Sequence, residues 1–150
     1  FIISHNGTTV GVFTDIGAPC KEVIRYFKKC HAAFLESNYD EAMLENGKYP
    51  LHLKNRIRGN TGHLSNSQAL ELFIKHRPPY MKQLLLAHLS KENNDPALVE
   101  QLFTQHSNGT FITVASRYKP TAVFPVTSTS SRANGIVKKI IKPLQLGLFE

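Results

Sequence analysis

The chain has 150 residues, of which 41% are hydrophobic and 19% charged, as is ordinary for a single globular domain with a buried core. Nothing in it resembles a signal peptide or a membrane span, and we expect a cytoplasmic protein without membrane contact. The net charge of +7 favours a polyanionic partner such as nucleic acid. Cys20 and Cys30 have neither metal-binding nor redox spacing, and we expect both to be buried, reduced thiols.

The N-terminal part of the chain has the pattern of a hairpin followed by a helix and a strand. Residues 1–4 and 8–13 are expected to be strands, because Asn6-Gly7 between them tolerates the positive φ of a tight turn. Pro19 suits the first turn of a helix that runs to about residue 29, and a short buried strand is expected at 32–35.

The rest of the chain continues this alternation of helices and strands. The expected elements are helices at 40–45, 50–59, 68–76 and 95–106, and strands at 84–87, 111–115 and 121–126. Ser65 or Asn66 is expected to cap the third of these helices. The β-α-β-α-β order predicts an α/β fold over residues 1–126, followed at 127–150 by a small polar linker and a basic tail.

Polar residues at the ends of three expected strands are suited to metal chemistry. Asp15, Glu36 and His88 stand at these strand ends, and His63 precedes a helix. Open α/β sheets place ligand chemistry at this edge, and imidazole nitrogen and carboxylate oxygen both bind zinc. A carboxylate can also bridge two metals, as two-metal hydrolytic sites require. The alternatives are that Asp15 caps the following helix, that Glu36 forms a salt bridge, and that the two histidines are structural.

Four short motifs occur in a fixed order along the chain. They are Thr14-Asp15-Ile16-Gly17, Leu35-Glu36-Ser37-Asn38, Gly62-His63-Leu64-Ser65 and Ala87-His88-Leu89-Ser90. Further matching stretches are Tyr49-Pro50, Leu53-Lys54-x-Arg56-Ile57 and Leu89-Ser90-Lys91-Glu92-Asn93-Asn94. Together these motifs resemble the nucleic-acid-cleaving branches of the metallo-β-lactamase fold, which include ribonuclease Z-like enzymes. The resemblance is most specific for the bacterial YycJ-like (WalJ/VicX) branch and covers roughly residues 1–125.

This resemblance implies a fold and a role for each matching residue. The fold would be half of an αββα sandwich, a mixed sheet with flanking helices. Asp15 would bridge two divalent metals, zinc or manganese, and His88 would be the last histidine ligand. Glu36 and His63 would form a pair near the leaving group that orients it or donates a proton. Three further polar residues would contact phosphate: Asn38, Ser65 and Asn93.

One part of the family pattern is absent from this sequence. The His-x-His-x-Asp-His signature, which supplies most metal ligands in the family, does not occur in the 150 residues. Asp15 and His88 alone are too few ligands for tight zinc binding. We therefore expect the chain to be the C-terminal half of the fold, and the activity to belong to the complete protein.

Two other stretches suggest contacts with partners. Lys54, Arg56 and Arg58 lie between two motifs, where they can follow a phosphate backbone or form a solvated helix face. The segment 145–149 resembles the Gln-Leu-x-Leu-Phe peptide that docks on bacterial sliding clamps. The residues that would contact the clamp are Gln145, Leu146, Leu148 and Phe149. The alternative for this segment is that it packs on its own domain.

These observations favour a metal-dependent phosphodiesterase that acts on nucleic acid, with DNA favoured over RNA. One alternative is a small-molecule hydrolase of the same fold, against which the basic surface and the pairing of Glu36 with His63 both count. A second alternative, of another class, is a non-catalytic module for nucleic-acid or protein interaction whose metal site is lost. The absent metal-binding signature would support that alternative only if the native protein also lacks it.

Overall fold

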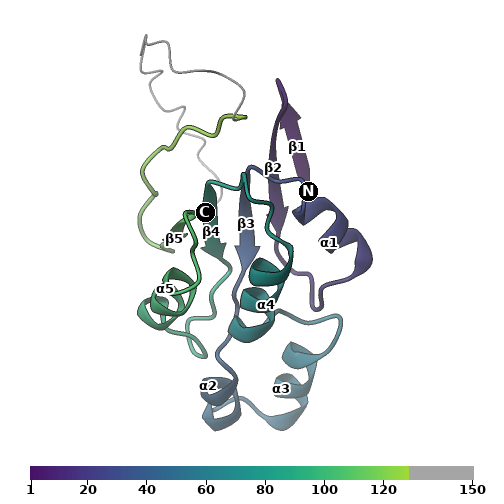
Figure 1. Cartoon of the computed structure of the whole chain (residues 1–150). Coiled ribbons are helices and arrows are strands. Elements are labelled where there is room, and N and C mark those ends of the chain that lie inside the picture. The colour runs from purple at the N-terminus through teal and green to yellow at the C-terminus, as the bar shows by residue number, and fades with distance from the viewer. Residues whose placement is uncertain (129–150) are drawn as a thin grey trace, which may run out of the picture.

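The five strands of the sheet are ordered in space as they are ordered along the chain (Figure 1). The computed structural model describes residues 1–128. The strands are β1 (Ile2–His5), β2 (Thr8–Phe13), β3 (Ala32–Glu36), β4 (Gln83–Ala87) and β5 (Phe111–Val114). β1 pairs antiparallel with β2, whereas β2–β3, β3–β4 and β4–β5 are parallel pairs. The carboxyl ends of β2, β3 and β4 therefore meet at one edge of a mixed sheet.

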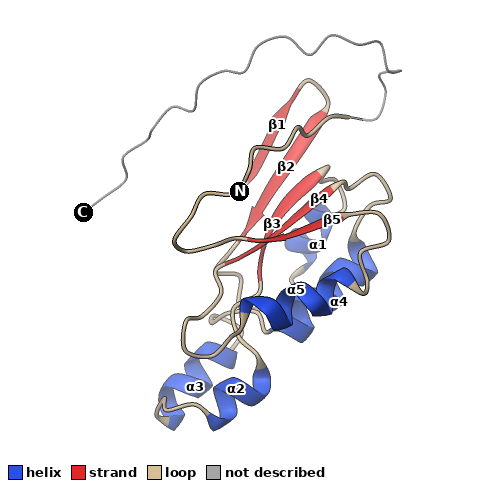
Figure 2. Ribbon diagram, turned by 90° about the vertical axis from the view of Figure 1, so that its left-hand side faces the viewer, coloured by secondary structure: helices blue, strands red, loops and turns tan. Residues whose placement is uncertain are grey.

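The helices of the described residues occupy two places relative to this sheet. They are α1 (Lys21–Phe27), α2 (Glu41–Asn46), α3 (Leu51–Arg58), α4 (Asn66–His76) and α5 (Pro96–Thr104). Figure 2 shows α1, α4 and α5 together on one face of the sheet. In Figure 1, α2 and α3 lie beyond the carboxyl end of β3. The predicted α/β class, a mixed sheet with flanking helices, is confirmed, and the arrangement is consistent with part of an αββα sandwich.

The hydrophobic core lies between the sheet and the helices on its covered face. Phe13, Leu35 and Leu86 are aligned across β2, β3 and β4, and each is at most 5% exposed. Phe27 of α1 packs edge-on against Phe13, with ring centroids 5.4 Å apart. Burying one such side chain contributes about 1.5–3 kcal/mol. The core thus fixes the strand register, and the register fixes where each strand end lies.

The turns and helix starts explain most of the agreement with the sequence. Asn6 and Gly7 have φ of 45° and 75°, so the predicted hairpin turn is confirmed. The Ser65 side chain accepts a bond from the Gln68 N–H, and the Gln68 side chain accepts one from the Ser65 N–H. This capping box begins α4 at Asn66, two residues before the expected start.

Two expectations near α1 are wrong. The helix begins at Lys21 rather than at Pro19, and its N-cap is Cys20, which makes no side-chain bond to the helix. Cys20 is consequently exposed, whereas Cys30 is buried as expected. Asp15 does not cap α1, so the structural alternative for that residue is excluded.

The strand expected at 121–126 is also wrong, because residues 121–128 have no regular secondary structure. Pro120 and Pro125 have no N–H to donate to a neighbouring strand. Val123 is 96% exposed, and the Ser128 N–H donates to Thr8 Oγ1 at 3.1 Å. Within residues 1–128, no helix has both the length and the apolarity that a membrane crossing requires. The expected division after residue 126 stays a prediction.

Candidate metal centre

Four residues that are far apart in the sequence meet at the carboxyl edge of the sheet. Asp15, Glu36, His63 and His88 each place one potential ligand atom within 4.8 Å of those of the other three. The parallel register that pairs Glu36 with Ala87 puts His88 directly beside the end of β3. The structure therefore brings together all four residues that the strand ends and motifs had indicated.

The backbone turns sharply at two of these residues. Asp15 has φ of 56° and His88 has φ of 59°, a left-handed conformation that non-glycine residues seldom adopt. Each such residue costs of order 1–3 kcal/mol and persists only where the surrounding structure imposes it. Asp15 lies two residues after the end of β2 and His88 directly follows β4, so that side chains that follow neighbouring strands converge on one site.

Glu36 is the buried centre of the group. Its side chain is 0% exposed, and its Oε1 lies 2.6 Å from His63 Nδ1 and 3.0 Å from His88 Nδ1. Its Oε2 accepts a hydrogen bond from the Ile16 N–H at 3.3 Å. A carboxylate that is buried away from solvent requires such hydrogen-bond partners, because an unpaired buried charge strongly destabilises the fold. Glu36 thus binds both imidazoles at Nδ1 and leaves both Nε2 atoms available.

Asp15 is the open member of the group. Its side chain is 67% exposed, and its Oδ1 lies 3.8 Å from His63 Nδ1 and 3.7 Å from His88 Nδ1. These separations are too long for hydrogen bonds, so the Asp15 carboxylate stays available for another partner. The two rings meet edge to face, with centroids 5.0 Å apart.

The donor set fits a divalent metal. Glu36 lies at hydrogen-bond distance from the rings and orients them, as carboxylates commonly do for metal-binding histidines. The groups left to hold a metal are an Asp15 oxygen and the imidazoles of His63 and His88, whose potential ligand atoms lie within 4.8 Å of one another. Three protein ligands of these types suit a catalytic zinc site, and manganese accepts the same donors. The structure therefore offers one more donor, His63, than the two ligands expected from the sequence.

The segment that precedes His63 packs against the turn that carries Asp15, and glycines permit this approach. A Cβ added at Gly17, whose φ is 49°, would lie 2.2 Å from the Asn60 carbonyl oxygen. A Cβ added at Gly62 would lie 2.1 Å from the Ile57 carbonyl oxygen. The His63 N–H donates to that same Ile57 oxygen at 2.8 Å. A larger residue at Gly17 would push the two sides of the site apart, and one at Gly62 would distort the turn that positions His63.

A buried network of polar side chains joins the three segments that follow Glu36, His63 and His88. Ser37 Oγ donates to Asn66 Oδ1 at 2.7 Å, and Asn66 Nδ2 donates to Asn94 Oδ1 at 2.9 Å. Asn94 Nδ2 closes the ring on the Ser37 carbonyl oxygen at 2.8 Å. All three side chains are buried. Sequence reasoning missed this network, although all three residues lie within or next to the recognised motifs.

The three residues expected to contact phosphate are buried and make bonds within the protein. Asn38 Nδ2 donates to the His88 carbonyl oxygen at 2.6 Å, Ser65 caps α4, and the Asn93 N–H donates to Ser90 Oγ at 3.2 Å. These bonds hold the loops around the cluster in place. A phosphate contact by these residues stays a prediction without support from their positions.

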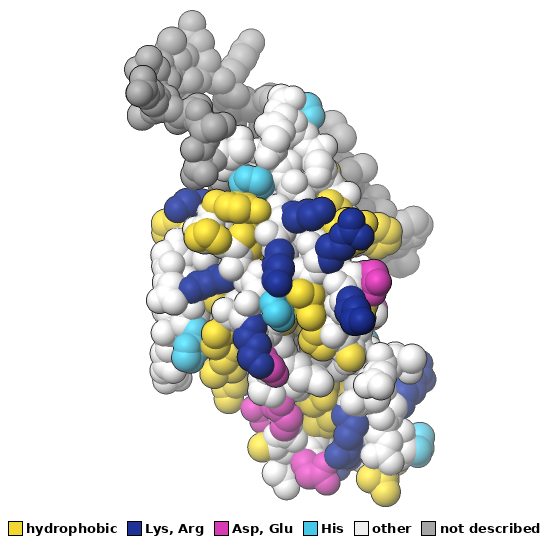
Figure 3. Space-filling view, turned by 45° about the vertical axis from the view of Figure 1, so that its right-hand side comes forward, with side chains coloured by type: hydrophobic (Ala, Val, Ile, Leu, Met, Phe, Trp, Pro, Cys, Tyr) yellow, Lys and Arg dark blue, Asp and Glu magenta, His cyan; other side chains and the backbone are white. Residues whose placement is uncertain are grey.

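Two of the three basic residues of α3 bind its neighbour α2. Lys54 Nζ donates to the Glu45 carbonyl oxygen, and Arg58 forms an ion pair of 3.1 Å with the Glu45 carboxylate. Arg56 is exposed and makes no ion pair within residues 1–128. Figure 3 shows Lys and Arg side chains spread over the face it draws, with acidic side chains beside basic ones in its lower part. The role of the α3 residues in phosphate binding stays a prediction.

No protein-family model matches the chain. The sequence is 35% identical over 83 residues to proteins named exodeoxyribonuclease WalJ from two strains of Streptococcus pneumoniae; the match covers 55% of this chain and 31% of each relative. It is 30% identical over 105 residues to exodeoxyribonuclease YycJ of Bacillus anthracis, which covers 70% of this chain and 40% of that protein. The chain thus matches less than half the length of these relatives. This partial homology confirms the resemblance to YycJ-like nucleases of the metallo-β-lactamase family.

Proposed function

We propose that the chain contributes metal-binding and proton-transfer residues to a metal-dependent phosphodiesterase that cleaves DNA. The observation that carries this proposal is the cluster of Asp15, Glu36, His63 and His88 within 4.8 Å. The cluster occurs in a chain with partial homology to proteins named exodeoxyribonucleases. Since the chain matches less than half of these relatives, we assign the activity to the complete protein.

Asp15 and His88 hold the metal in this proposal. Within residues 1–128 the Asp15 carboxylate is exposed and accepts no hydrogen bond, so it would be free to hold a metal. His88 Nδ1 is held by Glu36 at 3.0 Å, which fixes the ring with Nε2 free. Divalent ions such as zinc or manganese, when bound, supply Lewis-acid chemistry for phosphodiester cleavage.

His63 acts on the leaving oxygen. Its Nδ1 lies 2.6 Å from the Glu36 carboxylate, which holds the ring in place. In this role, Nε2 would donate the proton that the departing oxygen requires. Such a positioned acid contributes about 10²–10⁴-fold to a rate. His63 could instead be a third metal ligand. The two roles differ in the metal content expected for His63→Ala, which would keep its metal if His63 is a proton donor and lose it if His63 is a ligand.

DNA is the favoured substrate on two grounds. The relatives are named as exodeoxyribonucleases, and the net charge of +7 attracts a polyanion. The α2–α3 pair, which carries Arg56, lies beyond the carboxyl end of β3, the strand that ends at Glu36 (Figure 1). A small-molecule hydrolase would gain nothing from this charge.

A sliding clamp is a proposed partner through the segment 145–149, which lies outside the described residues. Its pattern places Gln145 for a hydrogen bond and Leu146, Leu148 and Phe149 for apolar contact. Tethering a nuclease to a clamp would raise its effective concentration on DNA.

The experiment that tests the proposed activity compares three forms of the complete protein. Bound zinc and manganese are counted, and cleavage of DNA is measured, for the native protein, for Asp15→Asn and for the exposed control Glu22→Gln. We expect Asp15→Asn to lose metal and cleavage together while Glu22→Gln keeps both. Cleavage that survives metal removal would refute the proposal. A native protein that binds neither metal nor cleaves DNA would favour the non-catalytic module.

A further inference from the structure

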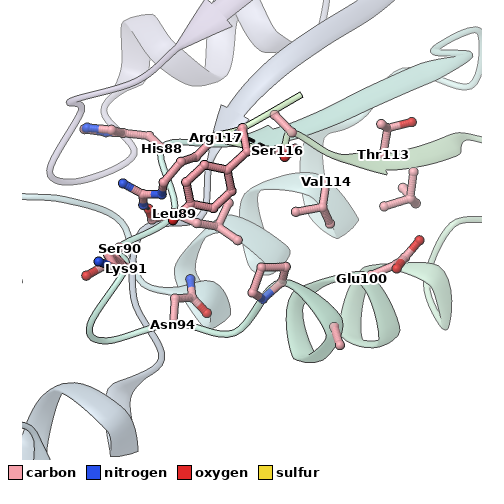
Figure 4. A pocket seen from close by; sticks show the side chains of 15 residues that line it. His88, Leu89, Ser90, Lys91, Asn94, Glu100, Thr113, Val114, Ser116 and Arg117 are labelled. Carbon is pink, nitrogen blue, oxygen red and sulfur yellow. Dashed lines mark hydrogen bonds between the residues drawn. The ribbon is translucent and has the colours of Figure 1, made fainter. Parts of the chain in front are cut away.

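A pocket of about 860 Å³ lies between α5 and β5, beside the loop that carries His88 (Figure 4). Figure 4 shows His88 at one end, with its ring turned away from the pocket, and Glu100 and Thr113 at the other end. The walls include apolar side chains from three segments: Leu89, Pro96, Ala97, Ile112 and Val114. The volume and the apolar walls lie within the range of small-molecule sites. Sequence reasoning gave no indication of it.

An aromatic ring and two cations stand at this pocket. Tyr118 lines it although its side chain is 79% exposed. Arg117 Nη2 donates to the Leu89 carbonyl oxygen at 2.8 Å, which ties the segment of Tyr118 to the His88 loop. Ser116 Oγ accepts the Tyr118 N–H at 3.1 Å and so fixes the turn. Within residues 1–128, neither Lys91 nor Arg117 forms an ion pair.

The pocket and the metal centre share one short loop. The His88 side chain faces Glu36 and Asp15, whereas Leu89, Ser90 and Lys91 line the pocket. The pocket residues of this loop therefore follow His88 by one to three positions in the sequence. A polymer that reaches both places must pass over this loop.

We propose that the pocket binds a base of single-stranded DNA, stacked on Tyr118, with the adjoining phosphates against Lys91 and Arg117. This inference rests on the proposed function and specifies the form of its substrate. Every base has a π-face that stacks on an aromatic side chain, and backbone phosphates attract nearby cations. Bases of an intact duplex are already stacked and cannot enter, so the pocket selects an unpaired strand next to the scissile phosphate.

The absence of tryptophan from the sequence allows a direct test. In the complete protein, any tryptophan outside these 150 residues is first replaced by phenylalanine, so that Tyr118→Trp introduces a single indole, whose fluorescence falls when a base stacks on it. Tyr26→Trp is a matched control, because Tyr26 is 42% exposed and has Arg25 and Lys29 at 5.8 and 5.7 Å from its ring but does not line this pocket. Both variants of the complete protein are titrated, with a chelator present, with a short oligothymidylate, an abasic oligonucleotide of equal length and a duplex.

We expect quenching in Tyr118→Trp by the oligothymidylate, at concentrations at least about fivefold below those needed for the abasic strand or the duplex. Filling the pocket with Ala97→Phe in the Tyr118→Trp protein should weaken that quenching by a similar factor. Equal quenching by the abasic strand, or equal quenching in Tyr26→Trp, would overturn the proposal in favour of phosphate attraction alone. The titration contains no free metal, so it measures base binding independently of cleavage. A negative titration would therefore overturn the pocket proposal alone, and loss of metal-dependent cleavage would overturn the proposed function alone.

Discussion

The buried carboxylate of Glu36 lies 2.6 Å from Nδ1 of His63, and the same oxygen lies 3.0 Å from Nδ1 of His88. One group at the end of β3 therefore sets the orientation of two imidazoles that come from different loops. Because both rings meet Glu36 at Nδ1, Nε2 is in each ring the nitrogen that Glu36 does not engage. Any change at Glu36 must then affect both histidines at once.

The two histidines can be distinguished by metal content. Asp15→Ala or His88→Ala should remove metal and abolish cleavage by the complete protein, because each removes a proposed ligand. His63→Ala should keep its metal while turnover slows by about 10²–10⁴-fold, as expected for a lost proton donor. Metal analysis beside single-turnover kinetics checks this. Equal metal loss in all three variants would make His63 a ligand instead.

Arg56 allows a cleaner test of phosphate binding than its neighbours do. Neutralising Lys54 or Arg58 also removes a bond to Glu45 that holds α3 to α2. Arg56→Gln should weaken DNA binding and lower the slope of log affinity against log salt by about 0.9 if one phosphate contact is lost. Binding titrations at several salt concentrations measure this slope, with Arg25→Gln on α1 as the control. An unchanged slope would place Arg56 on a solvated face.

The ring of Ser37, Asn66 and Asn94 should matter for stability. Asn66→Ala and Asn94→Ala each leave a buried polar group without its partner, which costs about 1–3 kcal/mol of unfolding free energy. The double variant should lose less than the sum, because both changes break the same ring. Urea denaturation gives these values, and the exposed Asn55→Ala serves as control. Strictly additive losses would show that the ring does not act as a unit.

The two thiols should differ sharply in reactivity. Burial raises the pKa of Cys30 from 9.0 to about 11, whereas Cys20 is exposed. At neutral pH, alkylation followed by mass spectrometry should modify Cys20 in the native protein and Cys30 only after unfolding. Above pH 9, the unfolded chain loses the Cys30 proton more readily than the folded one, so this thiol lowers stability as the pH rises toward 11. Equally fast modification of both thiols would contradict the buried position of Cys30.

The terminal segment can be tested as a peptide. Residues 140–150 should bind a bacterial sliding clamp with micromolar affinity, about −8 kcal/mol, since a short extended peptide must be ordered on binding. Calorimetry against the same peptide with Leu148 and Phe149 changed to alanine provides the measurement and its control. If both peptides bind equally poorly, the proposed clamp contact is wrong.

The sequence predicted the strand ends well because each apolar run stops at one polar residue, as at Glu36 and His88. The double contact of Glu36 could not be predicted, since it depends on the pairing of Glu36 with Ala87 across two strands. The apolar spacing of 121–126 suggested a strand, but two prolines and the lack of a pairing partner exclude one. The pocket beside α5 was missed because its walls come from three separate segments.

The left-handed backbone at Asp15 and His88 sets the stability of the fold against the chemistry of the cluster. Glycine adopts that conformation without steric penalty, so selection for folding alone would favour glycine at both positions. The chain instead has a carboxylate and an imidazole there, at two of the four non-glycine positions with positive φ within residues 1–128. Sequence optimisation guided only by stability would therefore favour replacing both residues, at the expense of the cluster.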